Sequence, residues 1–225
     1  MRMLLAAGLF FIGIHIIISS SPLRGVITGR IGERAYQAAF SLLSLAGLGW
    51  LIWSYIEADR LTLGYPPAWL LFLSVLTSMA GLWLAFMGIL SPNPTTIGQE
   101  GLLKSATRSQ GIVRVTRHPF MVGFALWALA HAVLNPDTAS LIFFGTFLVL
   151  AGLGPWLIDR KKARAMPDHW PDFASATSII PFQAILRGRN QFVSAEIGWW
   201  RPLAALLAVA LLFWFHGSLF GAALF

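Results

Sequence analysis

Six apolar runs divide the chain, and they constrain its fold more than any other feature. They cover residues 3–19, 38–56, 68–90, 120–134, 139–158 and 203–224. A helix that crosses the hydrocarbon core of a bilayer needs about 20 apolar residues, which most of these runs approach. Only 11% of the 225 residues are charged, against about 25% in a soluble domain. We therefore predict an all-α, polytopic membrane helix bundle with about six transmembrane helices, forming one domain over residues 1–225.

The basic residues predict how this bundle is oriented. Fourteen of the 16 Lys and Arg lie in the first, third and fifth connections between the runs. Positively charged loops resist translocation, so we predict an inner-membrane protein with cytoplasmic long loops and both termini outside. We expect the long connections, 91–119 and 159–202, to form a cap. Apolar residues interleaved with basic and polar ones indicate a segment in the membrane interface, where membrane lipid is the partner: Trp170, Phe173, Ile179, Ile180, Phe182 and Ile185.

Composition excludes several kinds of function. The formal charge of +7 does not indicate nucleic-acid binding, because the basic groups lie between apolar runs and form no exposed stripe. The absence of cysteine excludes disulfides, thiolate metal sites and a cysteine nucleophile.

Histidines inside the apolar runs are the first functional candidates, because ionisable groups are costly in a bilayer. Two runs repeat one pattern of a small residue, an aromatic residue and a histidine on one helix face: Gly8, Phe11, His15 and Gly123, Trp127, His131. Glycine lets a flat macrocycle approach, the aromatic residue packs on it, and imidazole ligates iron. Histidines that hydrogen-bond to neighbouring helices fit the same spacing.

His216, in the last run, is a third candidate ligand. Counting residues from the cytoplasmic ends gives His131 and His216 similar depths, whereas the repeated face pairs His131 with His15. An interfacial anchoring role is the alternative for His216.

A second candidate site precedes the fourth run. Arg117 and His118 lie directly before Pro119, which suits the first turn of a helix. The positive end of that helix, together with these side chains, would hold an anion or carboxylate. Positive-inside flanking, with arginines that reach lipid head groups, is the alternative.

Several short motifs occur together along the chain. They include His15 with Ser20-Ser21-Pro22-Leu23-Arg24, Ile31-Gly32-Glu33-Arg34, Gly98-Gln99-Glu100-Gly101-Leu102, Thr116-Arg117-His118-Pro119, Trp127-Ala128-Leu129-Ala130-His131, and Pro181-Phe182. In these motifs the chain resembles the NnrU family of membrane proteins, whose wider family includes plant zeta-carotene isomerase.

The resemblance implies a cofactor and two kinds of activity. In the isomerase branch it implies haem b, ligated at His15 and His131, and a haem-dependent cis-trans isomerase acting on a hydrophobic substrate. Gly123, Trp127, Arg117 and His118 would then contribute to cofactor binding. Bacterial members are linked by name to nitrite and nitric oxide metabolism, which implies a redox accessory role with respiratory or denitrification proteins.

One position departs from the plant pattern. The plant motif has a cysteine three residues before its second histidine, where this chain has Ala128. A ligand exchange that uses that thiol is therefore excluded.

Two alternative functions remain from the sequence. Arg117-His118-Pro119, followed by Trp170, Phe173 and Pro181, is also similar to membrane methyltransferases that use S-adenosylmethionine. In this chain the acidic pair expected after the fifth run is replaced by Asp159-Arg160-Lys161-Lys162. A non-enzymatic assembly factor for a respiratory enzyme, in which the histidines are structural, is the third class.

Overall fold

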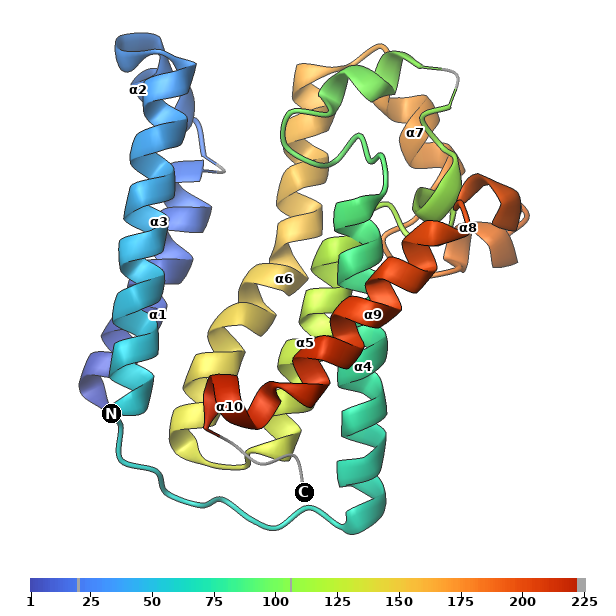
Figure 1. Ribbon diagram of the computed structural model, residues 1–225. Coiled ribbons are helices and arrows are strands. Elements are labelled where there is room, and N and C mark those ends of the chain that lie inside the picture. The colour runs from blue at the N-terminus through green and yellow to red at the C-terminus, as the bar shows by residue number, and fades with distance from the viewer. Residues whose placement is uncertain (20, 106, 222–225) are drawn as a thin grey trace. The chain divides into compact units, whose positions relative to one another are not determined.

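The described residues, 1–19, 21–105 and 107–221 of a computed structural model, form helices joined by loops (Figure 1). Within them the structure has no strand, and one isolated antiparallel bridge joins Thr62 to Asp137. The prediction of an all-α fold is confirmed. Ser20 of the first family motif and the last residues of the sixth apolar run, 222–224, lie outside the described part of the chain.

The helices follow the apolar runs closely. The α-helices are α1 (Arg2–Gly13), α2 (Leu23–Ile31), α3 (Glu33–Ile56), α4 (Ala68–Leu90), α5 (Pro119–Leu134), α6 (Thr138–Ala165), α7 (Trp170–Ala176), α8 (Gln183–Leu186), α9 (Trp200–Trp214) and α10 (His216–Phe220). A π-helical turn, η1 (Ile14–Ile18), continues α1, and short 3₁₀ turns occur at η2 (Glu100–Lys104), η3 (Gly111–Arg114) and η4 (Ser194–Glu196).

Helix length and hydropathy identify a membrane protein. Among the described residues, α3, α4 and α6 are long and apolar enough to cross a bilayer. Helices α1–η1 and α2 form a pair bent by 74°, which makes a fourth crossing only if the pair is one broken span and not a re-entrant loop. Helices α5 and α9 have 16 and 15 residues, or roughly 24 and 22 Å at ~1.5 Å per residue, less than the ~30 Å hydrocarbon core. The count of about six spans therefore stays a prediction.

The described chain divides into two compact units, each of which is described by itself. The first contains residues 1–75 and 128–157. In it α1 and α3 run side by side (Figure 1), and Gly8 packs on Thr146 of α6. Tyr55 of α3 hydrogen-bonds to Ser140 of α6 at 3.0 Å. Most of α3 is exposed, including Leu42 and Leu45, as expected for a helix that faces lipid.

The second unit contains residues 76–127 and 158–225. Its two central helices, α4 and α5, approach closely at Gly81 and Gly123. A Cβ added at Gly81 would lie 2.6 Å from the carbonyl oxygen of Gly123 and 2.9 Å from Cβ of Leu126. Small residues at such a crossing let two backbones pack in contact, which is how membrane helices gain van der Waals energy.

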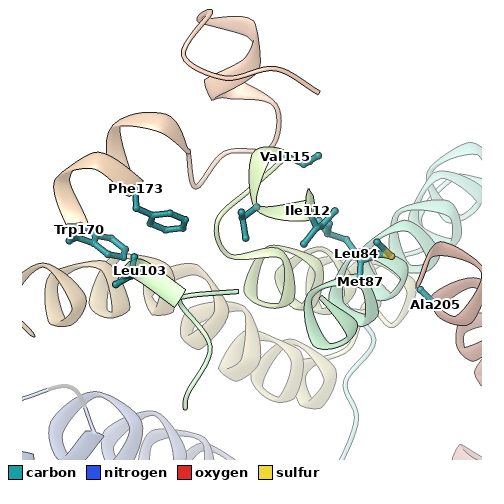
Figure 2. Close-up of a cluster of buried hydrophobic side chains, with 9 residues drawn as sticks. Leu84, Met87, Leu103, Ile112, Val115, Trp170, Phe173 and Ala205 are labelled. Carbon is teal, nitrogen blue, oxygen red and sulfur yellow. The ribbon is translucent and has the colours of Figure 1, made fainter. Parts of the chain in front are cut away.

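The two long connections share a hydrophobic cluster in this second unit (Figure 2). Leu103, Ile112, Val113 and Val115 come from residues 91–119; Trp170 and Phe173 come from residues 159–202. Trp170 and Phe173 are 6% and 0% exposed. These two aromatic residues therefore pack inside the protein and not in the membrane interface. The sequence could not show this, because the same pattern of interleaved apolar and polar residues fits both a protein core and a membrane interface. Ile180 and Phe182 of the same segment are exposed, so an interfacial position for that later part stays a prediction.

Candidate functional site

His15 lies in the π-helical turn that ends the first helix. Such turns are rare and occur often at functional sites. Its Nδ1 lies 2.8 Å from the carbonyl oxygen of Phe11, and because a carbonyl only accepts, Nδ1 carries the proton. In the neutral ring the lone pair is then on Nε2, which faces Ser44 Oγ at 3.4 Å. An imidazole fixed by a backbone carbonyl through Nδ1 has the tautomer that presents Nε2 to a metal.

His131 lies near the end of α5, and its ring is 5.0 Å from that of Phe144 on α6. A continuous series of aromatic contacts in the first unit joins it to His15. Phe11 is 4.5 Å from the His15 ring and 6.0 Å from Phe147. Phe143 lies 5.1 Å from both Phe147 and Phe144. The two predicted ligands therefore belong to one apolar, aromatic region.

The aromatic contacts also indicate the depth of each histidine. Phe11 lies beside Phe147, and His15 is four residues beyond Phe11, whereas His131 lies beside Phe144. Counted from the level where Phe11 meets Phe147, His15 lies four residues along α1–η1 in one direction, and Phe144 lies three residues along α6 in the other. At ~1.5 Å per residue, the two histidines are therefore offset by about 10 Å along the helices.

His216 begins α10 and packs against Phe220, with ring centroids 5.1 Å apart. It belongs to the second unit, whereas His15 and His131 belong to the first. In the described part of the chain no group of three or more His, Asp or Glu side chains could hold a metal ion. A pair of histidines is the donor set that the chain offers in its first unit.

The two predicted faces, Gly8 with Phe11 and Gly123 with Trp127, have different neighbours in the structure. Gly8 packs on Thr146, and Gly123 packs on the backbone of α4. Trp127 stacks on Phe124 with ring centroids 4.8 Å apart. In the described structure the missing side chain of Gly123 serves helix packing, and its part in cofactor binding stays a prediction.

Arg117 and His118 converge on one carboxylate, Asp159 of α6. Arg117 donates from Nε and Nη2 to Asp159 Oδ2 at 2.9 and 2.7 Å, and its Nη1 donates to the carbonyl of Thr177 at 3.1 Å. His118 Nε2 donates to Asp159 Oδ1 at 2.6 Å. The sequence predicted an anion or carboxylate here, and the structure supplies one from the chain itself.

Burial is the main influence on the His118 imidazole, whose side chain is 1% exposed. Burial lowers the pKa of His118 below its ordinary value, the hydrogen bond and charge of Asp159 oppose this, and the charges of Arg117 and Lys162 add to it. The ring is therefore neutral at pH 7, and Nε2 carries the proton that Asp159 accepts.

Three further ion pairs join the long connections in the described structure, and the sequence did not reveal them: Arg114 with Glu196, Lys162 with Glu100, and Arg108 with Asp172. Arg114 donates to both carboxylate oxygens of Glu196 at 2.6 and 2.7 Å, and this hydrogen bonding lowers the pKa of Glu196. Lys162 is buried and donates to Glu100 at 2.7 Å. Glu100 and Glu196 lie inside the long connections and away from the apolar runs, so no pattern in the sequence pairs them with Lys162 and Arg114.

Comparisons with known proteins gave a family match and matches to two plant proteins. The family described as NnrU protein matches residues 3–224. Over 80 residues the chain is 36% identical to the chloroplastic 15-cis-zeta-carotene isomerase of Arabidopsis thaliana, and over 81 residues it is 32% identical to that of Zea mays. Each match covers 36% of this chain and 22% of the relative, so the matched stretch spans about a fifth of the length of these isomerases. No solved structure matches the chain.

Proposed function

Since this chain belongs to the NnrU family, we propose that it is a membrane-bound, carotenoid isomerase-like protein that binds haem b between His15 and His131. The observation that carries the proposal is the tautomer of His15. The Nδ1 proton is donated to Phe11, so the neutral ring directs its basic nitrogen away from its own helix.

The surroundings of the two histidines fit a flat apolar group. Phe11, Phe40, Phe144 and Phe147 contact the histidines or each other at ring distances of 4.5 to 6.0 Å. Aromatic surroundings of this kind favour a macrocycle or a polyene over a polar substrate. With an offset of about 10 Å along the helices, His15 and His131 would reach one flat group only from different heights.

The residues have separate roles in this proposal. His15 and His131 hold the iron, and Phe11 fixes the His15 ring through its carbonyl. The aromatic side chains orient a hydrophobic substrate, such as the 15-cis-zeta-carotene named for the plant relatives. When bound, the haem would supply an iron centre whose electronic state acts on a double bond of that substrate.

The absorption spectrum of the purified protein tests cofactor binding. We expect a Soret band in the wild type, its loss in His15→Ala and in His131→Ala, and its retention in His216→Ala and in the loop variant His169→Ala. A Soret band retained in all four variants would contradict histidine ligation. Binding of S-adenosylmethionine without a Soret band would favour the methyltransferase alternative.

Activity needs a separate measurement. We expect a pigment-producing host that accumulates 15-cis-zeta-carotene to convert it when it expresses this chain, and to fail with His15→Ala. A haem protein that leaves the pigment unchanged would support the redox accessory role linked to nitric oxide or denitrification.

A further inference from the structure

A small cavity in the second unit lies outside the histidine region. It has a volume of about 240 Å³, just below the ~300 Å³ at which typical pockets for whole small molecules begin. A carotenoid or a macrocycle is too large for it. The size suits a group of a few heavy atoms, such as a small anion or a head group.

The cavity wall carries more positive than negative charge. Arg108, Arg201 and Glu196 are its ionisable residues. Glu196 is paired with Arg114, and Arg108 is paired with the mostly exposed Asp172. No described carboxylate lies within ion-pair distance of Arg201. A negatively charged occupant therefore meets an arginine whose charge is not yet balanced.

The guanidinium of Arg201 is already held in place. Nε donates to the carbonyl of Leu90 at 3.1 Å, and Nη1 donates to the carbonyl of Ile197 at 2.7 Å. Within the described structure, Nη2 makes no hydrogen bond. A side chain fixed by two bonds, with its remaining donors unused, loses little conformational entropy when it binds an anion.

Ser91 provides the second, independent observation. It lines the cavity, its residue is 5% exposed, and its Oγ is buried with no hydrogen-bond partner in the described structure. Burying a hydroxyl without a hydrogen-bond partner destabilises the folded protein, and a bound acceptor would offset that cost. Rotation about the Cα–Cβ bond moves Oγ among three staggered positions. Ser91 follows Leu90, whose carbonyl accepts from Arg201, so Ser91 and Arg201 line neighbouring parts of the cavity.

We propose that this cavity binds a phosphate-type oxyanion, with Arg201 and Ser91 as its donors. The neighbouring surface connects the site with lipid. Arg201 belongs to the first turn of α9, and exposed apolar residues lie before it at Trp199 and after it at Leu203 and Leu207. Pro92, Leu102, Ile112 and Ile197 add apolar wall. The same oxyanion can therefore arrive as the phosphate of a lipid head group or as a free phosphate.

Binding measurements on the detergent-solubilised full chain separate these two sources. One arm measures retention of phosphatidylglycerol against phosphatidylcholine by native mass spectrometry. The other titrates inorganic phosphate and follows thermal unfolding. Selective retention of phosphatidylglycerol assigns the lipid source, whereas stabilisation by millimolar phosphate assigns the free anion.

Variants test the donors themselves. Ser91→Ala removes a hydroxyl that makes no bond in the described structure, so the fold should be retained while anion affinity falls about tenfold, as for one hydrogen bond to a charged group. Arg201→Gln should abolish selectivity. Ser54→Ala removes the other buried hydroxyl without a described partner, and Lys104→Gln removes an exposed charge; both should bind as the wild type does.

Two outcomes would overturn the proposal. One is wild-type affinity in both Ser91→Ala and Arg201→Gln. The other is a wild type that neither prefers phosphatidylglycerol nor is stabilised by phosphate. Both readouts are independent of haem content, so failure of the haem proposal leaves this test intact.

Discussion

At the scale of single residues, Arg117 shows that the partner of a predicted anion site can come from the chain itself. The pattern Arg-His-Pro predicted a site for an anion or carboxylate, and in the structure Asp159 accepts from both Arg117 and His118. Asp159 is 42 positions from Arg117 along the chain, so spacing could not pair them. Removing Arg117 would leave the carboxylate of Asp159, whose side chain is 13% exposed, without its cationic partner. Breaking a fully buried pair costs about 3–5 kcal/mol, which is an upper bound here. Lost activity in Arg117→Ala would therefore not identify a substrate anion.

His118 makes stability depend on pH. Its pKa in the folded protein is lowered, chiefly by burial, whereas in the unfolded chain it is about 6.5. The unfolded state therefore binds the proton first as pH falls. The stability that neutral His118 contributes is complete above pH ~6.5 and is lost as pH falls towards the folded-state pKa, by at most about 1.4 kcal/mol per pH unit.

Thermal unfolding in detergent between pH 7.5 and 5.5 measures this effect. We expect the wild type to lose stability across that range and His118→Gln to show a shallower slope. His169→Gln, in a loop, should keep the wild-type slope. An unchanged slope in His118→Gln would mean that other groups carry the pH dependence.

At the scale of elements, the apolar runs predicted the helices well because burial in lipid or protein requires a continuous apolar surface. They could not show that α6 continues seven residues past its apolar run, to Ala165. That extension carries Asp159 and Lys162, the partners of His118 and Glu100. The π-turn at His15 was also invisible, because it changes hydrogen bonding without changing the residue pattern.

The crossing of α4 and α5 gives a prediction at this scale. In Gly81→Ala the new Cβ would lie 2.6 Å from the carbonyl oxygen of Gly123, so the helices must separate. Overpacking of this kind costs about 1–3 kcal/mol. Gly145→Ala on α6 has no atom within 4 Å of its new Cβ and should be neutral or stabilising by up to ~1 kcal/mol. Thermal unfolding of both variants in the same detergent tests the pair, and equal melting temperatures would argue against a tight crossing.

At the scale of the whole molecule, the family and the all-helical membrane class were predictable, whereas the number of spans was not. Composition and short motifs do not depend on how distant segments pack. They therefore indicated the family, whose model matches residues 3–224. Whether a short helix crosses the bilayer depends on tilt and local thickness. Helices α5 and α9 are the two in question, because each is shorter than a straight span requires.

Orientation follows from the basic residues if six segments cross. The long connections hold most of the Lys and Arg and would lie in the cytoplasm. The chain has no cysteine, so a single introduced cysteine reports its own side of the membrane. We expect Lys104→Cys and Arg187→Cys to be shielded from an impermeant thiol reagent in whole cells, and Tyr65→Cys to be labelled.

The side of the membrane on which the C-terminus lies shows whether the last segment crosses, because each span moves the following residues to the other side. With the fifth connection in the cytoplasm and α9 spanning, a reporter fused after Phe225 should be active outside. A cytoplasmic reporter, with Arg187→Cys still shielded, would mean that the segment from α9 onward does not cross. Labelling of Arg187→Cys and shielding of Tyr65→Cys would instead reverse the whole orientation, and the distribution of basic residues would then have failed as its determinant.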